Sequence, residues 1–122
     1  MLREIITIII IIILIFFGDS VTDKYTRYAT DTMIGMLEEL NIDNENSKEK
    51  ITEINEKWDD IKNKMAYYIE HNELEKVENN LKAIESAIEM NEVDDGEIYI
   101  NQCKYMLKHI KEKYEFNLQN IF

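Results

Sequence analysis

No proline occurs among the 122 residues, and there are only three glycines, one tryptophan and one cysteine. The single cysteine excludes an internal disulfide and a cysteine-rich zinc site. Positive charge is also scarce, because 14 Lys and Arg stand against 25 Asp and Glu, for a formal net charge of -11. A nucleic-acid-binding surface needs basic residues to displace counterions. We therefore predict no nucleic-acid partner.

A chain of this length forms one domain at most. Hydrophobic residues make up 45% of the chain, which is too many for a disordered protein. Charged residues make up 32%, so each helix or strand has to keep one face in water.

The N-terminal segment is apolar over residues 5–17, with Thr7 as the one interruption. Residues 8–13 are six consecutive isoleucines, a composition that aggregates in water. In lipid the same residues form a helix, because every backbone polar group there needs an internal partner. Residues 2–21, at about 1.5 Å each, give roughly 30 Å, enough to cross a bilayer. The sequence therefore predicts contact with membrane lipid through residues 5–17.

Three interpretations of this segment remain open. The favoured one is an uncleaved anchor over residues 1–20, followed by a domain over residues 21–122. A cleaved signal peptide is the second, since Gly18 and Ser20 are small enough for the cleavage site, although Asp19 lies between them. A buried core helix is the third, but a helix that is apolar on all sides needs a larger protein around it.

The charges that flank the apolar segment are nearly balanced, with Arg3 on one side and Lys24 and Arg27 on the other. Signal-like N-terminal segments usually deliver the domain behind them across the membrane. We therefore expect a single-pass protein of the cell membrane whose C-terminal domain is extracytoplasmic.

Apolar residues beyond Ser20 recur at alternating spacings of three and four, which is typical of amphipathic helices that pack along one seam. The pattern predicts helices at about residues 21–40, 47–70, 73–90 and 97–115. The expected fold is all-α: an N-terminal transmembrane helix, then an antiparallel up-down bundle of three to four helices, joined by short loops. The first of these helices can continue from the apolar segment without interruption. The predicted core positions of the last three are Ile51, Ile54, Trp58, Ile61, Met65, Tyr68, Leu74, Val77, Leu81, Ile84, Ile88, Ile100, Cys103, Leu107, Ile110 and Tyr114.

Local signals set the expected helix boundaries. Asn46 with Glu49, and Asn72 with Glu75, have the spacing of a capping box, in which each side chain satisfies a free backbone N–H of the first turn. The second pair places a break at His71 and Asn72, with a bend within one long helix as the alternative. Asp94 or Asp95 is expected to cap the fourth helix, and the apolar tail of residues 116–122 to fold back over one end of the bundle.

Several strings resemble one family, domain of unknown function 4363, which comprises small proteins of spore-forming, low-GC Gram-positive bacteria. The strings are EINEKWDDIKNK at residues 53–64, YYIEHNELEKVENNLKAIE at 67–85 and NLQNIF at 117–122, together with the apolar N-terminal segment. The resemblance covers essentially the whole chain. It implies a membrane-associated helical domain whose function is not established, and it supplies no catalytic residues.

The sequence contains no pattern that predicts catalysis, a cofactor or a metal site. A di-metal bundle needs Glu three residues before His, whereas Tyr68 and Met106 occupy those positions before the two histidines. The two acidic turns lack the glycine or the ligands of a calcium-binding loop. Cys103 lies on the apolar seam, where packing is its expected role. We therefore predict that the protein is not an enzyme.

The function that these observations favour is a membrane-anchored, non-catalytic helical module, which interacts with another membrane or envelope protein or serves as a structural component of the cell envelope. The alternative is a secreted or anchored protein that binds a cation or a small ligand, since excess negative charge attracts cations. The sequence does not specify the oligomeric state. The expected partner contacts are Tyr25, Tyr28, Met33, Met36, Ile121 and Phe122, with core filling as the alternative role of each methionine.

Overall fold

The computed structural model describes the backbone of residues 1–121 and the side chains of residues 1–114. Its regular structure over residues 1–121 consists of four helices: α1 (Leu2–Glu39), α2 (Ser47–Met65), α3 (His71–Glu89) and α4 (Val93–Ile121). The same residues form no strand. The predicted all-α fold is therefore confirmed.

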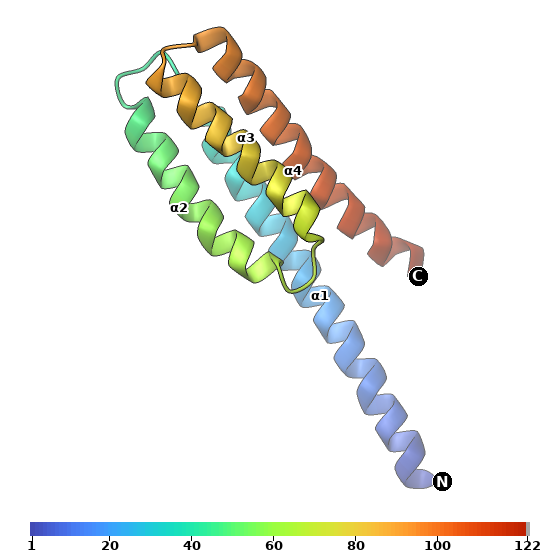
Figure 1. Ribbon diagram of the computed structural model, residues 1–122. Helices are drawn as coiled ribbons and strands as arrows, with labels where there is room; N and C mark the ends of the chain where they lie inside the picture. The colour runs from blue at the N-terminus through green and yellow to red at the C-terminus, as the bar shows by residue number, and fades with distance from the viewer. Residues whose placement is uncertain (122) are drawn as a thin grey trace.

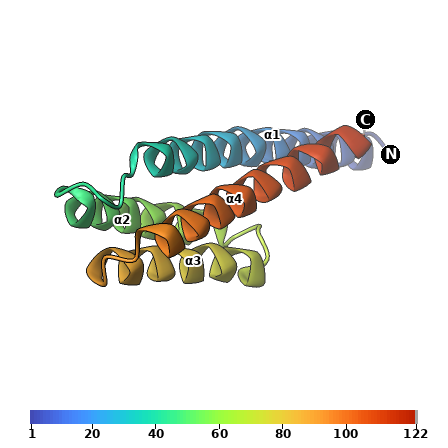
Figure 2. The ribbon, with the colours of Figure 1, turned by 90° about the horizontal axis from the view of Figure 1, so that it is seen from above.

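The four helices form an up-down bundle in which each helix packs against two others (Figure 1 and Figure 2). α1 lies beside α2 and α4, and α3 lies on the other side of the same two helices. Short connections between successive helices force them to run antiparallel. The α1–α2 and α3–α4 connections therefore lie at one end of the bundle, and the α2–α3 turn lies at the other.

α1 is a single helix of 38 residues that belongs to two environments. Its first half projects beyond the bundle as an isolated rod (Figure 1), and its isoleucines there are about half exposed because no described residue of the bundle packs against them. Its second half contributes Thr26, Ala29, Thr30, Met33 and Leu37 to the interior. By length and composition α1 can cross a membrane, a test that a signal sequence also passes.

The interior of the bundle is formed by the residues at the predicted seam positions. Trp58, Leu81 and Leu107 are each at most 2% exposed, and they come from α2, α3 and α4. Tyr68 and Tyr114 are partly buried and pack against this core. The predicted stripes of all three helices are therefore confirmed. Burial of these apolar side chains, at about 25 cal/mol per Å² removed from water, is the main stabilisation of the fold.

The break between α2 and α3 lies earlier than the sequence predicts. α2 ends at Met65 rather than near residue 70, and α3 begins at His71, so Asn72 is inside α3 and the predicted Asn72 capping box is wrong. The turn over residues 66–70 is held by the Ile69 N–H, which donates to the Met65 carbonyl at 2.8 Å. Ile69 itself is only 4% exposed, and its burial fixes the turn against the core.

The other predicted caps also differ in detail. Asn46 precedes α2 as expected, but its side chain makes no capping hydrogen bond. α4 begins at Val93, so Asp94 and Asp95 lie in its first turn, where carboxylates still interact favourably with the helix dipole. The fourth helix does not end near Glu115, because the backbone of α4 remains helical to Ile121. Residues 116–121 continue the helical backbone of α4 and do not turn back over an end of the bundle, so the predicted fold-back of the tail is wrong for these residues.

Candidate functional site

The two ends of the bundle have different chemistry. We call the end from which the apolar half of α1 emerges the proximal end, and the opposite end, with the connections at residues 40–46 and 90–92, the distal end (Figure 1). The proximal end contains the α2–α3 turn and a group of threonine and tyrosine hydroxyls. It is the part of the bundle that couples to the apolar segment.

Threonines line α1 where it enters the bundle. The Thr26 hydroxyl donates to the Thr22 carbonyl at 2.7 Å, and the Thr30 hydroxyl donates to the Thr26 carbonyl at 2.7 Å. Thr26 Oγ1 also lies 2.7 Å from the Tyr68 hydroxyl of the α2–α3 turn. Either hydroxyl can donate in this pair. The pair joins the turn to α1 through a polar contact in a largely apolar interior.

Tyr114 connects the same turn to α4. The Glu70 N–H donates to the Tyr114 hydroxyl at 3.3 Å, and the rings of Tyr68 and Tyr114 meet edge to face with centroids 6.1 Å apart. α1, α4 and the α2–α3 turn therefore meet at two tyrosines. Burial raises the pKa of both Tyr68 and Tyr114, so both phenols are protonated at neutral pH. These hydroxyls act as hydrogen-bonding groups that hold the turn, and not as nucleophiles.

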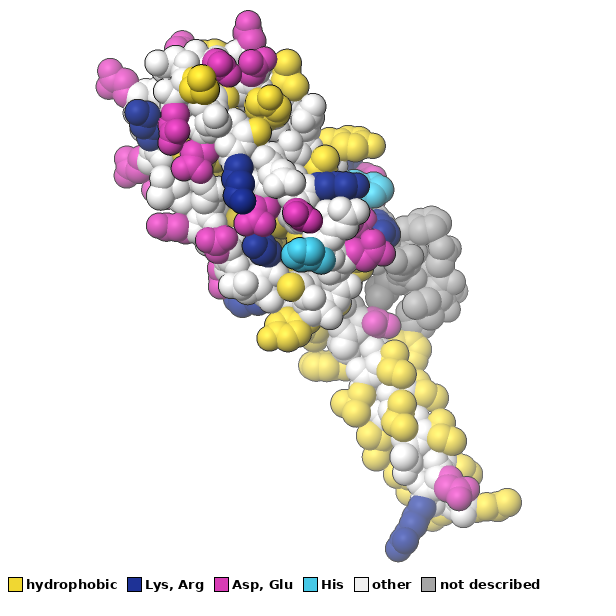
Figure 3. All heavy atoms as spheres, in the orientation of Figure 1, with side chains coloured by type: hydrophobic (Ala, Val, Ile, Leu, Met, Phe, Trp, Pro, Cys, Tyr) yellow, Lys and Arg dark blue, Asp and Glu magenta, His cyan; other side chains and the backbone are white. Residues whose placement is uncertain are grey.

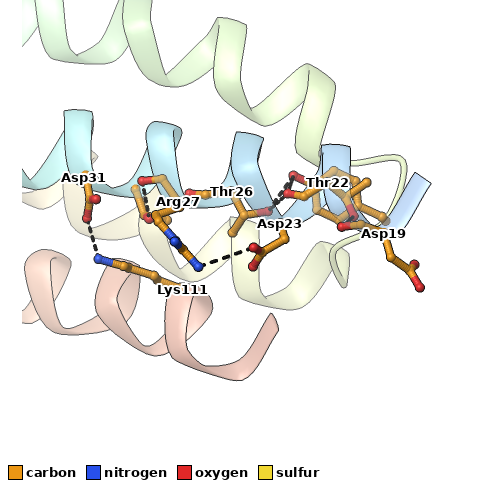
Figure 4. Close-up of polar contacts among 9 residues, drawn as sticks. Asp19, Thr22, Asp23, Thr26, Arg27, Asp31 and Lys111 are labelled. Carbon is orange, nitrogen blue, oxygen red and sulfur yellow. Dashed lines mark hydrogen bonds and ion pairs between the residues drawn. The ribbon is translucent and has the colours of Figure 1, made fainter. Parts of the chain in front are cut away.

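One surface ion pair marks the level at which α4 lies beside α1. Lys111 of α4 reaches Asp31 of α1 at 2.8 Å, and Arg27 pairs with Asp23 within α1 at 3.3 Å (Figure 4). Each such exposed pair contributes at most about 1 kcal/mol to stability. The Lys111–Asp31 pair is useful as a marker, because it shows which residues of the antiparallel helices α1 and α4 lie side by side.

Two of the predicted partner contacts lie together on the surface between α1 and α2. Tyr28 is 55% exposed, and its ring lies 6.3 Å from the ring of the partly buried Tyr25. Lys57 and Lys64 of α2 stand over these rings, 5.6 Å from the Tyr28 centroid and 5.7 Å from the Tyr25 centroid. The result is a small aromatic surface with two cations beside it, a composition that suits protein contacts.

The other predicted contacts are not on that surface. Met33 is fully buried, so its side chain fills the core and is not available to a partner in this conformation. Met36 is partly buried against the core. The side chain of Ile121 and the whole of Phe122 lie outside the described residues.

A groove between α3 and α4 was not predicted from the sequence. It has a volume of about 280 Å³ and is lined by Glu73, Lys76, Tyr105, Met106, His109 and Ile110. Glu73 Oε1 accepts a hydrogen bond from Lys113 Nζ at 3.0 Å, whereas its buried Oε2 has no partner among the described residues. The hydrogen bond to Glu73 raises the pKa of Lys113. Helical periodicity could not reveal this groove, because neither Glu73 nor His109 is at a predicted core position of its helix.

The described residues contain no grouping of three or more His, Cys, Asp or Glu side chains that could hold a metal ion. Cys103 is fully buried, and burial raises the pKa of its thiol to about 12. A thiol in this state is a poor nucleophile at neutral pH. The side chain is therefore part of the core, as the sequence indicates.

The negative charge is concentrated at the distal end. Residues 32–56 and 79–107 contain thirteen Asp and Glu and four Lys and Arg, a net charge of -9, whereas residues 19–31, 57–78 and 108–115 contain eleven and nine, a net charge of -2. Figure 3 shows Lys, Arg and His side chains gathered mainly in the half of the bundle nearer the apolar rod. The proximal end is thus nearly neutral.

Comparisons with known proteins place the chain in one family. No curated protein and no solved structure matches it significantly. The model of the family described as Domain of unknown function (DUF4363) matches residues 21–121. The matched region begins where the apolar half of α1 ends, and it includes the hydroxyl contacts, the tyrosine surface and the groove. The chain therefore belongs to the DUF4363 family.

Proposed function

We propose that this protein is a membrane-anchored, non-catalytic helical module that presents its bundle on the extracytoplasmic side to another protein of the membrane or envelope. The observation that carries the proposal is the continuity of α1, which extends from the apolar run at residues 5–17 into the core of the bundle. An uncleaved anchor of this form fixes the bundle to the bilayer by a helix and not by a flexible linker.

The surface chemistry supports an interaction role. Tyr28 is an exposed aromatic residue flanked by Lys57, and its ring lies near that of Tyr25, over which Lys64 stands. Tyrosine is common at protein interfaces because it contributes a large contact area with little loss of side-chain entropy. The buried, protonated Cys103 and the hydrogen-bonded tyrosines of the proximal end supply no activated catalytic group.

Site-specific photo-crosslinking in cells tests this role. A photoreactive phenylalanine analogue at Tyr28 should capture a membrane or envelope protein. The matched control places the same analogue at Tyr105, which is 71% exposed on α4. Capture from Tyr28 with little from Tyr105 supports the proposal. Equal capture from both, or none from either, contradicts it.

Membrane topology is tested separately. A cysteine introduced at the exposed distal residue Glu45 should react with a membrane-impermeant maleimide added to intact cells, whereas the buried Cys103 should stay unlabelled. Labelling only after the cells are opened would place the bundle in the cytoplasm and would contradict the extracytoplasmic part of the proposal.

A second candidate function is the binding of a cation or small ligand, and the α3–α4 groove favours it. Glu73 Oε2 is a buried acceptor without a partner among the described residues, and it lies in a groove of about 280 Å³. Thermal unfolding with increasing calcium, magnesium, zinc or a polyamine tests this function, because a ligand that binds the folded state raises the midpoint. A rise that is lost in Glu73→Gln supports binding in the groove, and the absence of any rise excludes these ligands.

A further inference from the structure

Tyr67 is the most exposed aromatic side chain among the described residues of the bundle. It lies in the α2–α3 turn at the proximal end and is 90% exposed, although its neighbours Tyr68 and Ile69 are partly or fully buried. A large, amphipathic side chain left this exposed contrasts with Tyr68 and Ile69 of the same turn, which pack against the core. The level of the α2–α3 turn along α1 shows which part of a bilayer Tyr67 can reach.

The level of the turn along α1 follows from two contacts of Tyr68. Its hydroxyl lies 2.7 Å from Thr26 Oγ1 and 3.5 Å from the Thr22 carbonyl. Thr22 directly follows residues 2–21, which at about 1.5 Å per residue match the roughly 30 Å hydrocarbon core. The headgroup region of one leaflet is about 5 to 7 Å thick. When residues 2–21 occupy the hydrocarbon core, the α2–α3 turn therefore lies at headgroup level.

The end of α4 reaches the same level. Lys111 lies beside Asp31 of α1, with 2.8 Å between the paired atoms. The α4 backbone continues for ten more residues, to Ile121, which is about 15 Å in the direction of the apolar rod. Ten residues back from Asp31 along α1 is Val21, the last residue of the expected membrane span. Both the α2–α3 turn and the end of α4 thus approach the plane in which α1 leaves the bilayer.

The charges of the bundle favour this approach. The proximal half has a net charge of -2 and the distal half a net charge of -9, so an anionic bilayer repels the proximal end far less than the distal end. Tyrosine is itself enriched at membrane interfaces, where the ring lies among the headgroups and the hydroxyl faces water.

From this geometry we infer that the proximal end of the bundle is a second membrane contact, in which Tyr67 of the α2–α3 turn inserts into the lipid headgroup layer beside the exit of α1. The inference rests on the proposed function, because it requires α1 to lie in the bilayer. It adds that the bundle rests directly on the membrane surface, which fixes its orientation and directs its acidic distal end away from the lipid.

Depth-dependent fluorescence quenching tests this contact in the full-length protein. The variants Tyr67→Cys, Glu45→Cys and Ile10→Cys are labelled with an environment-sensitive fluorophore and reconstituted into phosphatidylcholine vesicles that contain phosphatidylglycerol. Cys103 is fully buried and should remain unlabelled in the folded parent protein. Tyr67 and Glu45 are both exposed turn residues, so their replacement should leave the helical circular dichroism unchanged.

We expect nitroxide lipids labelled at the headgroup to quench the probe at residue 67 several-fold more than the probe at residue 45. Acyl-chain nitroxides should quench the probe at residue 10. Quenching at residue 10 with residue 67 as unquenched as residue 45 overturns the headgroup contact and leaves the anchor intact. No quenching at residue 10 overturns the anchor, and the headgroup contact with it.

Discussion

The proximal and distal ends of the bundle are closed by different kinds of side chain. At the distal end, the α1–α2 connection buries Ile42 against Gly96 and Ala87, and a dense acidic surface surrounds it. At the proximal end, Thr26, Tyr68 and Tyr114 close the bundle through hydroxyl contacts, and the charges nearly balance. The difference fits the proposal that the distal end faces water and the proximal end faces the lipid headgroups.

The largest expected effect comes from the core that both ends share. Leu81 of α3 is 1% exposed, so Leu81→Ala removes buried contacts and leaves a cavity, at a cost of about 2 to 5 kcal/mol. Urea unfolding of the full-length protein in detergent micelles measures it, with Lys82→Ala as an exposed control that should change stability by less than about 0.5 kcal/mol. Circular dichroism and Trp58 fluorescence should report one common transition. Two separate transitions would show that the ends unfold independently.

A glycine at the distal end gives the next largest effect. A Cβ on Gly96 would clash with the Ile42 side chain and meet the Ala87 Cβ at 3.3 Å, so Gly96→Ala should destabilise the fold by about 1 to 3 kcal/mol. A Cβ on Gly35 of α1 would have no described atom within 4 Å, and Gly35→Ala should stabilise by about 0.5 to 1 kcal/mol. Equal midpoints for the two variants in thermal unfolding would contradict the close packing of the distal end.

Alkaline pH should destabilise the bundle through its buried thiol and phenols. Burial raises the pKa of Cys103 from its ordinary value of 9.0 to about 12. The buried, protonated thiol therefore makes its full contribution to the free energy of unfolding below pH 9, and this contribution is lost as pH rises toward 12. The pKa of Tyr68 is also raised, which adds a loss above pH 10. Between pH 9 and 10.5 the free energy of unfolding should fall by about 1 kcal/mol per pH unit. Urea midpoints measured from pH 8 to 11 should fall less steeply in Cys103→Ala. Identical slopes would exclude Cys103 as the cause.

The smallest effect tests the proximal hydroxyl contacts. Tyr68→Phe keeps the ring against Tyr114 but removes the hydroxyl that is hydrogen-bonded to Thr26, and it should cost about 1 kcal/mol. Tyr67→Phe at the adjacent, exposed position should cost almost nothing in detergent. If both variants unfold at the wild-type midpoint, the hydroxyl contact contributes nothing and the proximal end is held by apolar packing alone.

Much of the fold follows from periodicity. The spacing of Ile51, Ile54 and Trp58 predicts burial of one face of α2, and the structure confirms it. Helix ends were harder to predict, because they depend on tertiary contacts. α2 ends at Met65 since Ile69 is buried and Tyr68 reaches α1, and neither contact leaves a local signature.

The candidate sites were less predictable than the fold. Tyr28 is exposed, as a partner contact requires, but Met33 proved to be core because it lies on the same face of α1 as Ala29 and Leu37. The proximal hydroxyl contacts join residues 42 positions apart, Thr26 and Tyr68, and no local pattern brings them together. The α3–α4 groove likewise depends on how two helices pack.

Hydrogen–deuterium exchange of the full-length protein in lipid vesicles tests the central claim most directly, namely that one unbroken helix connects the bilayer to the bundle. We predict slow amide exchange without interruption from residue 6 to residue 30, through Gly18 and Ser20, with the bundle core equally protected. Rapid exchange confined to residues 18–22 would reveal a hinge between anchor and bundle. Rapid exchange throughout residues 5–17 would place the apolar segment outside the lipid. Either result would contradict the claim of one continuous helix from lipid to core.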